Sequence, residues 1–378
     1  MAMDRLFHLM KDKKASDLFM TVNSPIHIKI NGHVLPINQQ KMDNATIKAL
    51  LAEVVSEAQI QELDAHNELN MGIPVQGLGS FRLSAFRQRG TISAVFRYIP
   101  GEIPKLSDLH VPPALADIIM EKRGLILVVG ATGSGKSTTI AAMLDHRNIM
   151  KTGHILTLED PIEFLFSNKK SIVNQREIGI DAESLKVALK NALRQAPDCI
   201  LIGEIRDKDT MAAALAYAQS GHLVVATLHA NNSYHALNRI INFYPLENRP
   251  SLLPDLAATI KAIISQRLVM TVDQNRRAAV EILVNTRHIS ELIEQGEIGQ
   301  IKEALEKSMS PGSQTFEQAL MQMIKDGVIT PEEGLANADS ATNLYWLLNN
   351  AESAKPEPPE PEPKKDDGPT FTEFTLNV

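Results

Sequence analysis

The sequence predicts an α/β fold in which a parallel sheet carries helices on both faces, preceded by a smaller α+β domain. Two patterns lead to this prediction. After Gly124, the apolar runs LILVV, HILTL, DCILI and HLVVATL alternate with segments of helical spacing. Fully apolar strands separated by helices are typical of parallel sheets covered on both faces. Before residue 100, apolar residues recur instead at every second position, as in an antiparallel sheet.

The N-terminal segment predicts a hairpin, a helix and further strands. Apolar residues alternate over 18–22 and again over 26–30, with the turn residues Asn-Ser-Pro between them, which is a hairpin pattern. Residues 47–55 repeat at helical spacing, and the two-residue period returns at 81–85 and 95–97. Helices packed on one antiparallel sheet satisfy this pattern.

The chain is long enough for two domains, since its 378 residues exceed one typical domain. The proline-rich stretch IPGEIPKLSDLHVPP interrupts regular hydrogen bonding and marks a connector. We therefore predict a first domain over 1–100, a linker over 101–113, a second domain with C-terminal helices over 114–350, and a tail over 351–378.

The C-terminal third is predicted to be mostly helical. A hairpin is expected at 268–284, with later helices around 316–324 and 344–348. The stretch AKPEPPEPEPKKDDGP contains six prolines and almost no apolar residues, so we expect a disordered tail. For the final FTEFTLNV, a frayed terminus is favoured over a short docking peptide.

Composition excludes several classes of protein. The single cysteine, Cys199, excludes a disulfide framework and a multi-cysteine zinc site. Apolar runs are too short for a membrane helix, and the N-terminus lacks a secretory pattern. A net charge of −7 without a basic stripe disfavours nucleic acid as a partner. We expect a cytoplasmic protein.

The strongest motif is GATGSGKS at 130–137, which fits G-x-x-x-x-G-K-[ST] between an apolar strand and a helix. In this motif glycines let backbone N–H groups converge on phosphates, the lysine reaches the β- and γ-phosphates, and the serine ligates Mg²⁺. The sequence therefore predicts ATP and Mg²⁺ as ligands. The predicted binding residues are Gly130, Thr132, Gly133, Ser134, Gly135, Lys136, Ser137 and Thr138.

Carboxylates follow two of the predicted strands. The run CILIGE delivers Glu204 to the edge of the sheet beside the phosphate loop, with Gly203 where an aspartate is more usual. We expect Ser137, Glu204 and water to hold the metal. Three more carboxylates, in the segment EDPIE at 159–163, crowd the end of another strand. One of them is expected to orient or deprotonate the attacking water, the alternative being an acidic solvated turn.

Two histidines and four arginines complete the candidates. His222 and His229 flank the strand LVVATL, where a histidine either senses a phosphate or is a satisfied core residue. Arginines remote from a phosphate loop either form a solvated face or reach a γ-phosphate, as in ring-shaped ATPases. The arginines concerned are Arg82, Arg87, Arg89 and Arg97.

Together, GATGSGKST, LTLEDPIEF, LRQAPDCILIGEIRD and GHLVVATLHANNS resemble the Walker A, Asp box, Walker B and His box of the ATPases of type II secretion and type IV pili. The segments KASDLFMTVNSPIHIKINGHV and SFRLSAFRQRGTISAVFRYIP resemble the PAS-like N-terminal domain of pilus retraction ATPases. The resemblance covers nearly the whole chain except its acidic tail. It implies a RecA-like P-loop core and a homohexameric ring that hydrolyses ATP.

The resemblance also implies roles for individual residues. Lys136, Ser137 and Thr138 would hold phosphate and Mg²⁺, Glu163 would be the general base, and Glu204 would support the metal. Arginines of the N-terminal domain, foremost Arg82 and Arg97, would complete the site, within one subunit or across the interface. His222 and His229 would couple the γ-phosphate to domain rotation.

Within this family the chain is most similar to the PilU-type branch of retraction ATPases. It lacks a four-cysteine zinc element, and Ser290 and Glu294 stand where the PilT-type motif AIRNLIRE has arginines. This implies an accessory motor at the inner membrane, working with a PilT-type retraction ATPase and a PilC-like platform protein in pilus retraction and twitching motility. The alternatives are an autonomous PilT-like motor, a nucleotide-binding structural subunit that supports a sibling ring, and a nucleic-acid motor, which the acidic balance disfavours.

Overall fold

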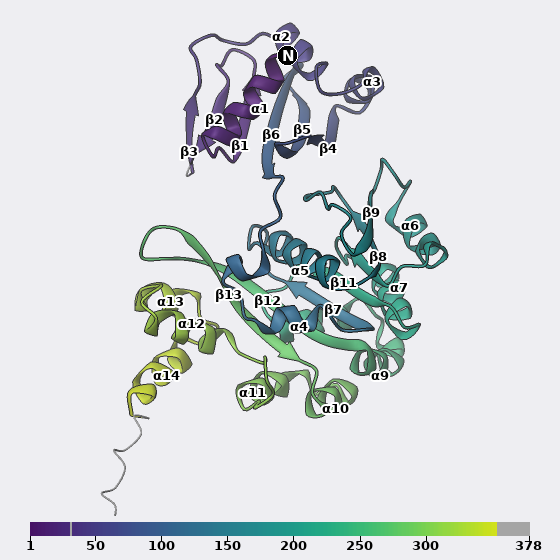
Figure 1. The fold of residues 1–378 in the computed structure, drawn as a ribbon, viewed down its shortest axis with the longest axis vertical. Helices are drawn as coiled ribbons and strands as arrows, with labels where there is room; N and C mark the ends of the chain where they lie inside the picture. The colour runs from purple at the N-terminus through teal and green to yellow at the C-terminus, as the bar shows by residue number, and fades with distance from the viewer. Residues whose placement is uncertain (31, 354–378) are drawn as a thin grey trace, which may run out of the picture.

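The computed structural model of the protein describes residues 1–30 and 32–353 and contains two separate sheets (Figure 1). All strands of the first sheet end by Pro100, and those of the second begin at Gly124. The segment between them includes a short 3₁₀ turn, Leu106–Leu109, and helix α4 (Ala114–Ile118). The division into domains at residues 100 and 113 stays a prediction.

The first sheet is antiparallel throughout, in the order β3-β2-β1-β6-β5-β4. Its strands are β1 (Asp17–Thr21), β2 (His27–Ile30), β3 (His33–Pro36), β4 (Glu68–Val75), β5 (Gly79–Gln88) and β6 (Thr91–Pro100). Its helices are α1 (Ala2–Asp12), α2 (Asn44–Leu51) and α3 (Glu57–His66). The predicted hairpin and the strands at 81–85 and 95–97 are confirmed.

Helix α1 packs on this sheet through residues one helical turn apart. Met3, Phe7 and Met10 are buried, a spacing that places them on one face of the helix. The ring of Phe7 stacks on Phe81 at 3.9 Å between centroids and meets Phe96 edge-on at 5.5 Å. These aromatic contacts fix the strands that carry the arginines at 82 and 97.

The second sheet has the order β13-β12-β7-β11-β10-β8-β9, and its pairs are parallel except β12–β13. Its strands are β7 (Gly124–Val129), β8 (Gly153–Glu159), β9 (Ser171–Glu177), β10 (Cys199–Ile202), β11 (Leu223–Leu228), β12 (Ile260–Met270) and β13 (Arg276–Val284). The predicted hairpin at 268–284 is confirmed, although its first strand begins at Ile260. The sheet is therefore mixed rather than wholly parallel.

Helices cover both faces of this sheet, as predicted. Along β7, Leu125 and Leu127 belong to one buried cluster, whereas Ile126 and Val128 belong to another on the opposite face. Alternate side chains of a strand point to opposite faces, so a strand apolar throughout must be covered on both. The helices are α5 (Lys136–Met150), α6 (Leu185–Ala192), α7 (Lys208–Gln219), α8 (Ser233–Asn242), α9 (Arg249–Thr259), α10 (Arg287–Gln295) and α11 (Ile301–Glu306).

Three C-terminal helices form one group, in which the first contacts β13, the second contacts β12, and the third packs on the other two (Figure 1). They are α12 (Phe316–Lys325), α13 (Pro331–Asn337) and α14 (Ala341–Ser353), and they include both predicted helices. Helix α14 ends at Ser353, three residues inside the predicted tail 351–378. The rest of that tail, with FTEFTLNV, lies outside the described residues. No helix within residues 1–30 and 32–353 is long and apolar enough to cross a membrane.

Candidate active site

A cleft of about 1210 Å³ lies between the first sheet and the C-terminal edge of the second. The first sheet contributes Arg82 and Arg97. Other predicted site residues follow parallel strands of the second sheet, in loops or in the first turn of α5, at the edge where open α/β sheets bind ligands. Those that line the cleft are Thr132, Gly133, Gly135, Lys136, Ser137, Thr138, Glu163, Glu204 and His229.

The phosphate loop needs glycine at two positions for a steric reason. Gly130 and Gly135 have φ angles of 152° and 86°, which side chains rarely adopt. A Cβ atom on Gly130 would lie 2.5 Å from the carbonyl oxygen of Gln266, and one on Gly135 would lie 2.8 Å from its Nε2. The loop therefore passes directly over Gln266, and α5 begins immediately after Gly135.

Gln266 is a residue that the sequence analysis missed. It lies on β12, 2% exposed, and its Nε2 donates to the carbonyl of Ser134 at 2.7 Å. The hydroxyl of Thr139 donates to its Oε1 at 2.8 Å. The amide thus joins the loop to the first turn of α5. The polar triplet Ser-Gln-Arg at 265–267, between the apolar residues of β12, was the available signal.

Lys136 and Ser134 have donors suited to a bound anion. The Lys136 ammonium donates to the carbonyls of Gly130 and Ala131, each at 2.9 Å. Burial lowers the pKa of Lys136, while the charges of Glu204 and Glu163 act to raise it. The buried Ser134 hydroxyl has no hydrogen-bond partner within the described part of the chain. An unpaired buried donor is costly unless a ligand accepts from it.

The oxygen donors beside the loop suit Mg²⁺. Ser137 offers a hydroxyl and Glu204 a carboxylate, and both line the cleft. Among the described residues, no three His, Cys, Asp or Glu side chains form a group that would hold a metal by themselves. Mg²⁺ commonly takes one or two protein oxygens and completes its shell with water and substrate phosphate. The residues present therefore fit this ion.

The carboxylates of EDPIE occupy different environments. Glu159, at the end of β8, accepts from Thr157 Oγ1 at 2.6 Å and from Gln175 Nε2 at 3.2 Å. Burial raises the pKa of Glu159. Glu163, in the loop that follows β8, also lines the cleft, and its Oε1 accepts from Arg82 Nη2 at 2.7 Å. Glu159 is thus bound within its own sheet, whereas Glu163 faces the first sheet.

Arg82 and Arg97 are direct neighbours in the first sheet, opposite each other in the β5–β6 pair. Arg82 pairs with Glu163, in the loop that follows β8 of the second sheet. Arg97 Nε instead donates to Oδ1 of Asp17 at 2.9 Å, and Asp17 is only 4% exposed. Of the other arginines singled out in the sequence, Arg87 pairs with Asp64 on α3.

Glu204 lies between two basic side chains. His229 Nε2 lies 3.2 Å from its Oε1, and Arg206 Nε donates to its Oε2 at 2.6 Å. Arg206 lines the cleft and was not singled out from the sequence. The preceding Gly203 has a packing reason, because a Cβ atom there would lie 3.1 Å from the carbonyl oxygen of Leu158. An aspartate there would therefore require a small shift of β8.

His222 does not reach the cleft. It stands immediately before β11, and its Nδ1 lies 3.1 Å from Ser220 Oγ and 3.3 Å from the Tyr217 carbonyl. His229 follows the other end of the same six-residue strand, which spans about 20 Å. The role at the γ-phosphate that the resemblance implies for His222 therefore does not fit its position within one chain.

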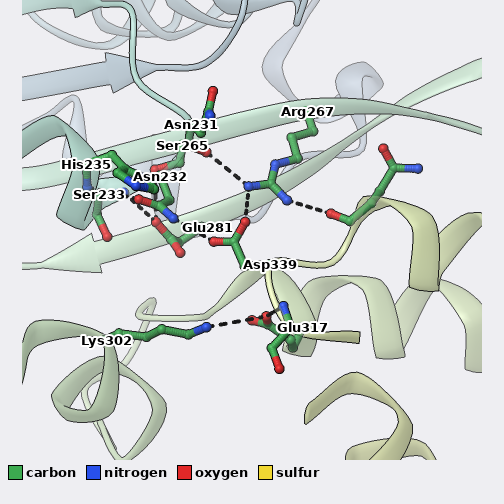
Figure 2. A network of polar contacts seen from close by, with 12 residues as sticks. Asn231, Asn232, Ser233, His235, Ser265, Arg267, Glu281, Lys302, Glu317 and Asp339 are labelled. Atoms are coloured by element: carbon green, nitrogen blue, oxygen red, sulfur yellow. Dashed lines mark hydrogen bonds and ion pairs between the residues drawn. The ribbon is translucent and has the colours of Figure 1, made fainter. Parts of the chain in front are cut away.

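The segment that follows His229 is tied to the C-terminal helices (Figure 2). The Asn231 carbonyl accepts from Arg267 at 3.2 Å, and Asn232 Nδ2 donates to Asp339 at 2.7 Å. Arg267 also pairs with Asp339 and lies 4.0 Å from the ring centroid of Phe316. Because Arg267 follows Gln266 on β12, one strand supports both the phosphate loop and this segment.

Comparisons with known proteins agree with this architecture. The family model described as type II/IV secretion system protein matches residues 2–336. The type IV pilus ATPase PilU of Pseudomonas aeruginosa is 45% identical over 92% of this chain and 91% of its own length. The retraction ATPase PilT of the same organism is 36% identical over 87% of this chain and 96% of its own length.

Solved structures give the same result. The crystal structure of the pilus retraction motor PilT with bound ADP has a TM-score of 0.83 and 37% identity, covering 90% of this chain and 99% of that one. The Legionella pneumophila ATPase DotB has a TM-score of 0.75 and 28% identity, covering 88% of this chain and 94% of that one. The predicted α/β fold is thus confirmed. With the family model matched from residue 2 to residue 336, the chain belongs to the type II/IV secretion system ATPase family.

Proposed function

We propose that this chain is an ATP-hydrolysing motor of a type IV pilus machine that drives pilus retraction and twitching motility. The observation that carries the proposal is the cleft in which the phosphate loop, Glu163 and Glu204 meet Arg82 from the first sheet. The names of its relatives, PilU, PilT and a twitching motility protein, support the pilus assignment.

In the proposed reaction, water attacks the γ-phosphorus, its proton passes to Glu163, and the bond to the β-phosphate oxygen breaks to release ADP. Lys136 and the loop N–H groups bind the phosphates. Ser137 and Glu204 would hold Mg²⁺, which supplies positive charge against the phosphate oxygens. Arg82 pairs with Glu163 in this structure. An ATP γ-phosphate competes for that guanidinium and leaves Glu163 free to accept a proton.

We further propose that six copies form a ring in which the state of each cleft sets the orientation of its two domains. His229 supports this coupling because it contacts Glu204 and begins the segment bound to Arg267 and Asp339. Rotation of the domains would act on a PilC-like platform protein at the cytoplasmic face of the inner membrane. Nucleic acid is not an expected partner.

Helix α10 supports an accessory role beside a PilT-type ATPase. Of the two positions where the PilT-type motif has arginines, Ser290 donates to the carbonyl of Ala257 at 3.1 Å, and Glu294 is exposed. At Glu294 the chain thus presents negative charge where that motif presents positive charge. An autonomous PilT-like motor and a structural subunit are the competing proposals.

A hydrolysis assay separates a motor from a structural subunit. Purified protein should hydrolyse ATP, and Lys136→Ala should abolish the activity because the phosphates lose their cation. Lys325→Ala, on the exposed end of α12, is the matched control and should retain it. Wild-type protein without lysine-dependent hydrolysis would overturn the motor proposal and favour the structural subunit.

Retraction of labelled pili in cells lacking every retraction ATPase separates the accessory from the autonomous motor. We expect no retraction with this protein alone, and retraction when a catalytically inactive PilT-type protein is also present. The protein carrying Lys136→Ala should fail in the second arm. Retraction with this protein alone would overturn the accessory role and establish an autonomous motor.

A further inference from the structure

Glu177, the last residue of β9, joins the two sheets through main-chain N–H groups. Glu177 is buried, with 7% of its surface exposed. Oε1 accepts from the N–H of Gly72 on β4 at 3.3 Å, and Oε2 accepts from the N–H of Ile162 at 3.1 Å. One buried carboxylate therefore bridges the first sheet and the loop that follows β8.

The two N–H groups belong to the direct neighbours of the Arg82–Glu163 pair. Gly72 lies opposite Arg82 in the β4–β5 pairing, and Ile162 immediately precedes Glu163. Glu177 thus binds the backbone next to each partner. The same interface carries the 2.7 Å contact between the arginine and the carboxylate.

The position of Glu177 is itself fixed by the turn after β9. Its backbone N–H donates to Asp181 Oδ2 at 2.8 Å, and the next N–H, that of Ile178, donates to the carbonyl of Glu159 at 2.8 Å. Gly72 leaves just enough room, since a Cβ atom there would lie 3.0 Å from Glu177 Oε2. Within residues 1–30 and 32–353, no lysine, arginine or histidine forms a salt bridge with Glu177.

We propose that Glu177 is a positioning residue for ATP hydrolysis, which sets the register between the two sheets so that Arg82 and Glu163 meet in the cleft. The inference rests on the proposed function and deepens it. A carboxylate suits this role because its two oxygens accept from two separate donors. Glutamine offers one oxygen, and its NH₂ group would face the second N–H, so Glu177→Gln breaks one of the two links.

Steady-state hydrolysis with Glu177→Gln tests the inference. We expect kcat to fall about 10- to 100-fold, since small displacements of reacting groups have effects of that size. Affinity for a fluorescent ATP analogue should stay unchanged, because the phosphate loop has no contact with Glu177. Gly72→Ala, which crowds the carboxylate, should cause a smaller loss of the same kind. The matched controls are Glu183→Gln, exposed in the same turn region, and Gly299→Ala, where a Cβ meets nothing within 4 Å.

A double-mutant cycle with Arg82→Ala distinguishes positioning from general weakening of the fold. If Glu177 sets how Arg82 meets Glu163, Glu177→Gln should reduce kcat by a clearly smaller factor in the Arg82→Ala background than in the wild type, because neighbouring residues that act as a unit are not additive. The same fold loss in both backgrounds would overturn the inference. So would wild-type kcat in Glu177→Gln, or a loss explained by weaker nucleotide binding.

The outcomes also separate this inference from the proposed function. If wild-type protein shows no hydrolysis that depends on Lys136, the proposed function fails. If the wild-type protein hydrolyses ATP and Glu177→Gln has the same kcat, only the positioning role of Glu177 fails. Should Glu177→Gln not fold, Gly72→Ala carries the same comparison, with Gly299→Ala as its control.

Discussion

Arg82, on β5 of the first sheet, and Glu163, in the loop that follows β8 of the second, are 81 positions apart in the sequence, yet Nη2 of the arginine lies 2.7 Å from Oε1 of the glutamate. Their side chains are 34% and 27% exposed, so solvent screens the pair and its net contribution to folding is about 1 kcal/mol or less. Its importance is positional. The pair brings a cation of the first sheet to the carboxylate that we propose as the general base.

Glu163→Gln should bind ATP with near-normal affinity but hydrolyse it slowly. The amide cannot accept the proton of the attacking water, and loss of a general base typically costs on the order of 10² to 10⁴ in rate. Single-turnover hydrolysis and equilibrium nucleotide binding measure the two effects separately. Glu57→Gln, exposed on α3, is the control. Normal turnover in Glu163→Gln would exclude Glu163 as the base.

Arg82→Ala and Arg97→Ala should differ in what they change. Arg82→Ala should lower kcat by about 10³-fold or more, because arginines that stabilise phosphoryl transfer contribute on the order of 10³ to 10⁵ in rate. Arg97→Ala, unlike Arg82→Ala, should lower the free energy of unfolding by about 1 kcal/mol, because it leaves the buried Asp17 without its cation. Denaturant unfolding and steady-state kinetics measure both.

Asp17→Asn separates the two possible effects of Arg97. It should share the loss of stability with Arg97→Ala while keeping the guanidinium beside the cleft. If both variants keep full kcat, Arg97 has no part in hydrolysis. A loss of kcat in Arg97→Ala alone would place it at the nucleotide.

Gln266→Leu should weaken nucleotide binding and destabilise the fold. The Ser134 carbonyl and the Thr139 hydroxyl both lose a buried partner, at about 1 to 3 kcal/mol for an unsatisfied buried group. Isothermal titration with ATP and urea unfolding give the two values. The control is Gln61→Leu, exposed on α3. Unchanged ATP affinity in Gln266→Leu would show that the loop holds its shape without the amide.

Gly203→Asp should destabilise the protein rather than improve its metal site. The added Cβ would lie 3.1 Å from the Leu158 carbonyl oxygen and 3.3 Å from the Glu159 Cα, so β8 and β10 must move apart, at about 1 to 3 kcal/mol. Thermal unfolding measures this, with Gly299→Asp as the open-space control. An unchanged Tm would contradict the packing argument, and an increase in Mg²⁺-dependent ATP hydrolysis would contradict the expectation for the metal site.

Glu281 should make stability depend on pH. It is 6% exposed, accepts from Ser233 N–H and Ser265 Oγ, and burial raises its pKa above the usual 4.5, with the charge of Asp339 adding to the shift. Between pH 4.5 and the raised pKa, the folded chain binds more protons than the unfolded chain. The free energy of unfolding therefore falls as pH rises through this window.

Urea unfolding at a series of pH values tests this, with Glu281→Gln as the variant. The slope should become shallower but not vanish, because burial also raises the pKa of Glu159 and gives a contribution of the same sign. A slope identical to that of the wild type would mean that Glu281 titrates alike in the folded and unfolded chains.

Local sequence patterns predicted the strands that are buried on both faces of the second sheet. Strands β7, β8, β10 and β11 each contain a short, mainly apolar run, and such runs between helical segments identify buried parallel strands without tertiary information. Strand β9 was missed because it lies at the sheet edge and carries the polar run NQRE. Helix α1 was missed although its buried residues follow helical spacing, because charged residues separate them.

The sequence by itself determined the phosphate loop, the carboxylates after β8 and β10, and the arginine pair on β5 and β6, because each depends on residues close together in the chain. Only the tertiary structure decided which of them meet. In the structure, Arg82 pairs with Glu163, and Gln266 lies beneath the phosphate loop. Glu177 links the two sheets, and His222 lies at the end of β11 opposite to the cleft. These contacts join residues from separate strands, and their pairing follows from sheet order and register, which no local pattern encodes.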